Sequence, residues 1–153
     1  MLSRKITSDL IADFVIHFYH DHGDCVTNLK LQKLVYYIQA WYLAINNKPL
    51  FQEDFEAWVH GPVIPALYRR FKKYSFSDIL EHPDSPQLQK SVIDHIKEVL
   101  KVYSGFSAFQ LEQMTHNEDP WLKARKGIPE DESCTNIIKK SDMTVFYKKL
   151  AAT

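Results

Sequence analysis

Apolar side chains recur every three or four positions along most of the chain, which is the spacing of one buried face of an α-helix. The first two stripes comprise Leu10, Ile11, Phe14, Val15 and Phe18, followed by Leu31, Leu34, Ile38, Trp41 and Ile45. Thr7 or Ser8 can cap the first helix and Thr27 the second, because these hydroxyls accept backbone hydrogen bonds. The first helix is expected to end at Gly23 and the second near residues 46–47.

The same spacing, with start and stop residues at its borders, predicts five more helices. They are expected over residues 64–74 with Pro65 in the first turn, from Ser85-Pro86 to Gly105, from Ser107 through Met114, from Pro120 to Gly127, and from Ser141 onward. Asp119 is expected to cap the helix that Pro120 begins. Residues 75–85 and 128–134 have the composition of loops.

Two short stretches have β-forming composition instead. These are FEAWV at residues 55–59 and TNII at residues 135–138, with Gly61-Pro62 marking a turn after the first. The chain has only 4 glycines, too few to close many tight hairpins. The expected fold is therefore mostly α: a single compact domain over residues 1–153, with about seven helices and, if both stretches form strands, a short two-stranded β ribbon.

Charge and composition exclude several classes of protein. The 19 Lys and Arg residues balance 19 Asp and Glu residues, whereas binding of nucleic acid by bulk charge normally shows as a basic surplus. Polar residues such as Lys5 and Asp9 interrupt the start, and no apolar run approaches the roughly 20 residues that span a bilayer. Cys25 and Cys134 lack zinc-like spacing. We therefore expect free thiols, a cytoplasmic protein and no contact with a membrane.

The segment HFYHDHGDC is the one local cluster of potential metal ligands, comprising His17, His20, His22, Asp24 and Cys25. His20 and His22 alternate across a helix end instead of stacking four apart on one face, and no second cluster completes a tetrahedral set. A solvated helix end, where histidines suit the helix dipole, is the preferred interpretation. No metal ion is expected.

A second polar cluster places His116, Glu118 and Asp119 beside Pro120 and Trp121. A hydrolase or transferase could use His116 as a base oriented by Asp119, and this alternative stays open. However, no glycine-rich phosphate loop, nucleophile elbow or cysteine–histidine signature accompanies the cluster. The preferred interpretation is a tight connection with Trp121 in the core, and we expect neither enzymatic activity nor a cofactor.

Two segments have the composition of a protein-binding surface. LYRRFKKY would turn Phe71 and Tyr74 inward on a helix while its cations fan across the outer face, which suits an acidic protein surface, although a solvated face is the alternative. The rings of YYIQAWY cover too wide an arc for all of them to be buried. Tyr37 and Tyr42 are therefore expected at a partner contact, and Trp41 in the core.

Three segments in series also carry a family resemblance: KLQKLVYYIQAWYLA (30–44), FEAWVHGPVIPALYRRFKKY (55–74) and LEQMTHNEDPWLKAR (111–125). Their order and spacing resemble the Panacea domain, also described as the SocA-like antitoxin domain and found in phage-associated GepA-type proteins. The resemblance extends from about residue 8 to residue 150. It implies a bacterial or phage antitoxin that neutralises a cognate toxin, usually encoded by the adjacent gene, through direct protein contact.

The resemblance and the surface composition together give a set of candidate residues. At the partner contact we expect Tyr37, Tyr42, Trp58, His60, Tyr68, Arg69, Arg70, Lys72, Lys73 and His116. As residues of the motifs that maintain the fold we expect Lys30, Leu31, Lys33, Leu34, Gly61, Pro62, Pro120 and Trp121. The alternative function is a transcriptional or nucleic-acid-associated regulator that uses the basic helix 67–74. A homodimer stays open, and no added DNA-binding segment is expected.

Overall fold

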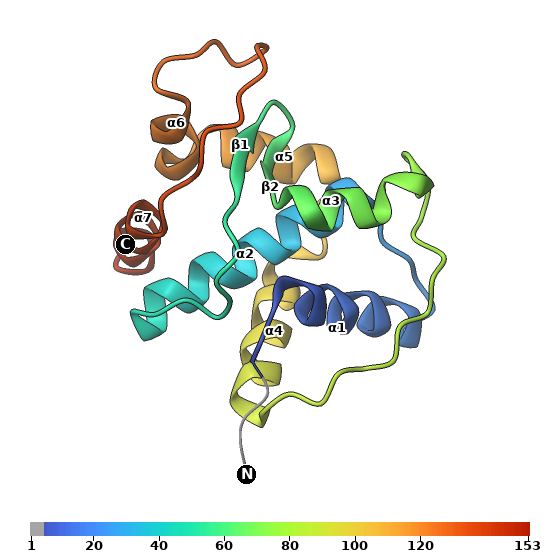
Figure 1. Cartoon of the computed structure of the whole chain (residues 1–153). Coiled ribbons are helices and arrows are strands. Elements are labelled where there is room, and N and C mark those ends of the chain that lie inside the picture. Colours follow the sequence, from blue (N-terminus) through green and yellow to red (C-terminus); the bar gives the residue numbers. More distant parts are fainter. Residues whose placement is uncertain (1–4) are drawn as a thin grey trace.

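The computed structural model describes residues 5–153, and residues 1–4 of the expected domain lie outside this range. The described chain is mostly α-helical with one small antiparallel sheet, which confirms the expected fold class (Figure 1). The elements in order are α1 (Ser8–Asp21), α2 (Asn28–Asn46), β1 (Glu56–Trp58), β2 (Gly61–Val63), α3 (Pro65–Phe71), the 3₁₀ helix η1 (Lys72–Tyr74), α4 (Lys90–Tyr103), α5 (Ala108–His116), α6 (Asp119–Arg125) and α7 (Lys140–Ala151).

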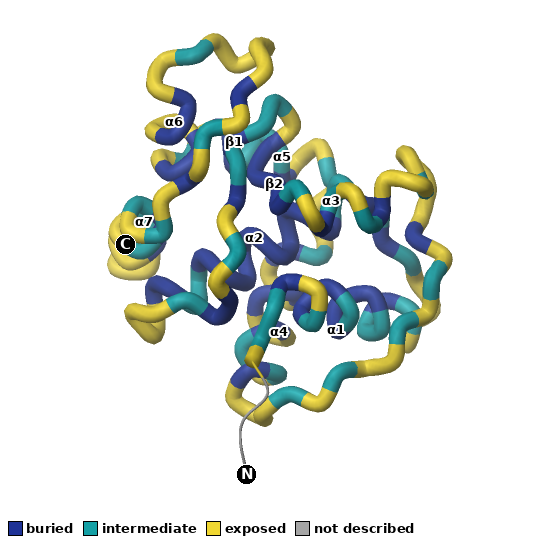
Figure 2. Tube along the Cα trace, viewed as in Figure 1, coloured by how far each residue is buried: buried dark blue, intermediate teal, exposed yellow. Residues whose placement is uncertain are grey.

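Helix α2 is the centre of the fold. It contacts helices α1, α3, α4, α5 and α7 as well as strand β2, and most of its length is buried (Figure 2). A helix buried on all sides must also satisfy its polar side chains, because an unpaired buried amide is costly. Gln32 accepts a hydrogen bond from the Ile64 backbone at 3.2 Å, and Gln39 bonds to the backbone of residues 50 and 51. These amides attach the two ends of the 50–64 segment to α2.

Three of the predicted helix starts are confirmed. Thr7 accepts a hydrogen bond from the Leu10 backbone, Thr27 accepts one from Lys30, and both distances are 3.3 Å. Ser107 forms a reciprocal capping box, in which the side chain of Gln110 accepts from the backbone of Ser107.

Three predicted starts are wrong. Helix α4 begins at Lys90, not at Ser85, because a turn at residues 75–77 leads into an irregular segment that runs past α1 to residue 89 and is anchored by the fully buried Ile79, whose N–H donates to Val26 (Figure 1). Asp119 already lies inside α6, and the extended residue before the helix is Glu118, which makes no side-chain cap. Helix α7 likewise begins at Lys140, so the predicted cap Ser141 lies one residue inside it.

The two-stranded ribbon is confirmed, but one of its predicted strands is not. Strand β1 pairs with β2 in the register Glu56 to Val63 and Trp58 to Gly61, so Gly61-Pro62 belongs to a strand and the turn lies at residues 59–60. The segment 135–138 lies along the other edge of β1 and makes only an isolated bridge there, between Glu56 and Ile137. Pro62 fits β2 because this strand is an edge of the sheet.

Within residues 5–153, no helix combines the length and the apolar composition that a membrane span requires.

Candidate functional site

The three sequence segments meet at the β1–β2 hairpin. Three consecutive carbonyl oxygens of its first strand and turn each accept a hydrogen bond, at 2.8 Å, from a side chain of α5 or α6. The donors and acceptors are Arg125 and Ala57, Trp121 and Trp58, and His116 and Val59. The third segment therefore holds the second by side-chain bonds to its backbone.

Gly61 lies where the first and third segments approach the hairpin. Its φ is +105°, a conformation that side chains with a Cβ rarely adopt. A Cβ there would lie 3.1 Å from Cε of Lys33 and 3.2 Å from Oγ1 of Thr115, closer than ordinary packing allows. The position therefore requires glycine, both for its backbone conformation and for the two side chains packed against it.

Lys33 is buried beneath the hairpin. Its ammonium donates to the Leu29 carbonyl at 3.3 Å, and burial lowers its pKa from 10.5 to about 8, partly opposed by the negative charge of Glu112. The expected role of Lys33 in maintaining the fold agrees with this position. Leu31 and Leu34, on the same helix, are fully buried as well.

The two histidines of the motifs differ in exposure. His116 is buried and stacks on Trp121 with the ring centroids 4.0 Å apart, so the expectation that it faces a partner is wrong. Its two ring nitrogens lie against the Val59 carbonyl and, at 3.0 Å, the Glu130 carboxylate, and neither contacts Asp119. The proposed base pair of His116 with Asp119 is therefore also wrong.

His60, in contrast, lies at the exposed turn of the hairpin, with Nδ1 2.9 Å from the Glu112 carboxylate. Two neighbouring rings are half-buried: Trp58 on β1 and Tyr68 on α3, with centroids 5.1 Å apart. All three side chains keep exposed surface, and their contact with a partner stays a prediction.

Tyr37 is fully buried, so its expected place at a partner contact is wrong. Its ring stacks on Tyr103 at 4.1 Å, and its hydroxyl donates to Glu118 at 2.7 Å. The sequence suggested too wide an arc of rings for one core face, but α2 is covered by neighbours on most sides and accommodates them. Tyr42, half-buried against His95, keeps some exposed surface.

Glu118 is a half-buried carboxylate, which the sequence interpretation placed beside His116 but to which it gave no role. It accepts hydrogen bonds from Tyr37 and from Tyr147 of α7, the latter at 2.9 Å. Burial raises the pKa of Glu118 above its usual 4.5, and the two tyrosine hydrogen bonds offset this only in part. The local pattern does not reveal these two hydrogen bonds, because the tyrosines come from helices far apart in the sequence.

The basic helix is less cationic than its sequence suggests. Arg70 is held by three carboxylates: Asp9 at 3.1 Å, Asp13 at 2.6 Å and Glu81 at 3.3 Å. The expected partner contact of Arg70 is therefore replaced by an internal ion cluster. Arg69, Lys72 and Lys73 are exposed, and their side chains extend outward as expected.

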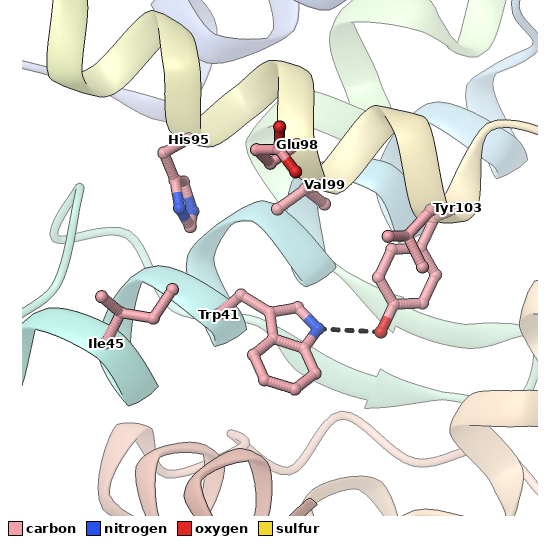
Figure 3. Close-up of a pocket in the computed structure, with 7 residues that line it drawn as sticks. Trp41, Ile45, His95, Glu98, Val99 and Tyr103 are labelled. Atoms are coloured by element: carbon pink, nitrogen blue, oxygen red, sulfur yellow. Dashed lines mark hydrogen bonds between the residues drawn. The ribbon is translucent and has the colours of Figure 1, made fainter. Parts of the chain in front are cut away.

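A hollow of about 250 Å³ lies between α2 and α4 (Figure 3). Trp41, Ile45, Val99 and Val102 give it an apolar lining, and Trp41 donates to the Tyr103 hydroxyl at 2.8 Å. Glu98 and His95 are the polar side chains in the lining, and burial lowers the pKa of His95. Trp41 thus lines a hollow at the surface in addition to contacting the core.

Each of the three histidines near the end of α1 contacts a different residue. His22 is hydrogen-bonded to the Phe18 carbonyl, His17 lies 3.5 Å from Asp21, and the ring of His20 lies tilted against that of His82 with the centroids 4.4 Å apart. In the described part of the chain, no three His, Cys, Asp or Glu side chains gather as a set of metal ligands.

The chain is similar to proteins of one known family. A family model described as "Antitoxin SocA-like, Panacea domain" matches residues 31–122, from α2 into α6. The protein "Antitoxin SocA" of Caulobacter vibrioides (strain NA1000 / CB15N) is 35% identical over an alignment of 109 residues that covers 63% of this chain and 58% of that protein. The match thus spans little more than half of the relative's length. No solved structure matches significantly. The residues that meet at the hairpin lie within or directly beside the matched range, and the chain belongs to the SocA-like antitoxin, Panacea domain family.

Proposed function

We propose that this protein is an antitoxin that neutralises a cognate toxin, encoded by the adjacent gene, through direct protein contact and without catalysis of its own. The observation that carries the proposal is the similarity to a protein named as an antitoxin, together with the family match. The geometry supports it, because the polar motif residues are engaged in holding the hairpin. The side chains of His116, Trp121 and Arg125 each donate a hydrogen bond to a backbone carbonyl of the hairpin.

We place the toxin contact on the exposed face that joins the hairpin turn to α3 and η1, called here the hairpin–α3 face: Trp58, His60, Tyr68, Arg69, Lys72 and Lys73. Its rings and cations suit a protein partner with acidic residues at its surface. Tyr37, His116 and Arg70 are not part of it, since each is engaged inside the molecule.

Co-expression tests the proposal. The product of the adjacent gene is expected to arrest growth alone and to become harmless and co-purify when this chain is present. A toxic product that stays unbound, or a product that is harmless alone, would overturn the proposed function.

A charge-reversed variant tests the surface. Replacing Arg69, Lys72 and Lys73 by glutamate is expected to weaken the complex at least about tenfold, because repulsion slows association and opposes the acidic surface. The matched control reverses Lys97, Lys101 and Lys149, which are equally exposed cations on α4 and α7. Equal loss in both variants would remove the hairpin–α3 face from the interface.

The same three cations are the observation that favours a nucleic-acid-associated regulator as the second candidate. That function predicts binding to DNA fragments that weakens steeply with salt. A gel-shift titration at low salt that shows no complex would exclude it.

A further inference from the structure

The chain makes an unusual turn directly after the basic residues of η1. Ser75 has φ +53° and ψ −123°, and the Ser77 N–H donates to the Tyr74 carbonyl at 2.9 Å. These are the angles and the closing bond of a type II′ turn, whose first central position is usually glycine. Serine there keeps a strained backbone, and strained positions are enriched at functional sites.

This turn holds Phe76 in solvent. Its exposed fraction is 85%, and among residues 5–153 no other large apolar side chain is as exposed. Leu80, four residues later, is 66% exposed, while Ile79 beside it is fully buried and bonded to the Val26 backbone at 2.9 Å. The segment is therefore fixed to the core at one residue and presents two apolar side chains outward. Exposed aromatic rings on a fixed backbone are the residues that anchor protein interfaces.

Three exposed cations on α3 and η1, Arg69, Lys72 and Lys73, come shortly before this turn in the sequence. Within the described range, Arg69 and Lys72 have no carboxylate within 4.0 Å, and Lys73 lies at that limit from Glu81. Glu81 is itself engaged by Arg70 at 3.3 Å. The other acids nearby are Asp9 and Asp13, which are paired with Arg70, and the exposed Asp78, whose backbone bridges to Thr27. Arg69 and Lys72 thus remain exposed cations close to the turn in sequence, and acidic groups around an apolar pocket would match them.

We propose that Phe76 is the anchor residue of this protein, inserting into an apolar pocket with an acidic rim on the toxin. This inference rests on the proposed function and extends the hairpin–α3 face to the turn that follows it. A protein pocket fits better than a lipid surface, because the feature is one ring on a fixed turn and not a continuous apolar helix face.

The experiment measures the affinity of the full chain for the purified product of the adjacent gene. Phe76→Ala is expected to weaken binding by about thirtyfold or more, the loss typical of a central aromatic anchor. The matched control is Phe109→Ala on α5, whose ring is 68% exposed, and a change below about threefold is expected. Both variants should melt like the wild type, since neither ring is buried.

The outcomes separate the two proposals. If the wild type neither binds nor neutralises the product, the proposed function and the anchor both fail. If the wild type binds and Phe76→Ala binds equally well, or loses no more than Phe109→Ala, only the anchor fails. Vesicles of equal parts phosphatidylglycerol and phosphatidylcholine are the remaining probe. If the wild type binds these vesicles, Phe76→Ala does not, and both proteins bind the toxin equally well, the ring belongs to a membrane surface and the inference is overturned.

Discussion

Replacing Gly61 by alanine should destabilise the fold more than any ordinary surface substitution. The backbone at φ +105° costs a residue with a Cβ about 1–3 kcal/mol. The new Cβ would also lie 3.1 Å from Cε of Lys33 and 3.2 Å from Oγ1 of Thr115, and overpacking of this kind costs about 1–3 kcal/mol. The expected loss is therefore about 2–6 kcal/mol of the free energy of unfolding.

Urea unfolding followed by far-UV circular dichroism measures this loss. The midpoint should fall while the slope against denaturant stays constant, because the native and unfolded surfaces are unchanged. In a thermal scan each lost kcal/mol lowers the melting temperature of a domain near this size by about 2–4 °C. Total stabilities are about 5–15 kcal/mol, so a large part of the chain's stability is at stake.

Gly105→Ala is the matched control. Gly105 lies outside the left-handed region, and a Cβ there meets nothing within 4 Å. This variant should be neutral or stabilised by up to about 1 kcal/mol, because alanine reduces the entropy of the unfolded chain. A Gly61→Ala protein within about 0.5 kcal/mol of the wild type would refute the reasoning, and so would a Gly105→Ala protein that loses as much.

Two further predictions concern strain and burial. Ser75→Gly should raise the free energy of unfolding by about 1 kcal/mol, since glycine relieves strain of about 1–3 kcal/mol and loses about 0.5–1 kcal/mol to chain entropy; an unchanged urea midpoint would contradict it. Glu118→Gln should gain stability relative to the wild type as pH rises from 4.5 toward neutrality. Because the pKa of Glu118 is raised in the folded protein, its contribution to the free energy of unfolding is complete below pH 4.5 and is lost as pH rises through the folded-state pKa. Glutamine does not titrate and has no such dependence. Parallel urea midpoints of the two proteins across that range would count against this account.

The helices were predictable where local chemistry decides them. Thr7, Thr27 and Ser107 cap their helices through hydrogen bonds three residues away, so the sequence contains both partners. Helix α4 was predicted five residues too early, because the irregular segment before it is anchored to the core by contacts such as the hydrogen bond of Ile79 to Val26. That contact joins residues far apart in the sequence.

The sequence predicted which residues belong to the candidate site better than it predicted which of them are exposed. The motifs contain the residues that meet at the hairpin, but whether a side chain faces inward depends on the neighbouring helices. Tyr37 is covered because Tyr103 of α4 stacks on it and Glu118 accepts its hydroxyl. Arg70 is neutralised by carboxylates of α1 and of the following loop, which no local pattern connects to it.

The hydrogen bonds to the carbonyls of residues 57–59 also fix the alignment of the two strands of the hairpin. A three-residue strand pair has few ladder bonds with which to resist slipping, and a shift by one residue would reverse every side chain. Here the guanidinium of Arg125, the indole of Trp121 and the imidazole of His116 each donate to one particular carbonyl of residues 57–59. Only one alignment of the strand satisfies all three donors. A slipped hairpin would separate the buried guanidinium of Arg125 from the Ala57 carbonyl and leave one of its N–H groups unpaired, at a cost of about 1–3 kcal/mol. The alignment of the smallest element in the fold is thus imposed from outside the sheet, by helices more than fifty residues further along the chain.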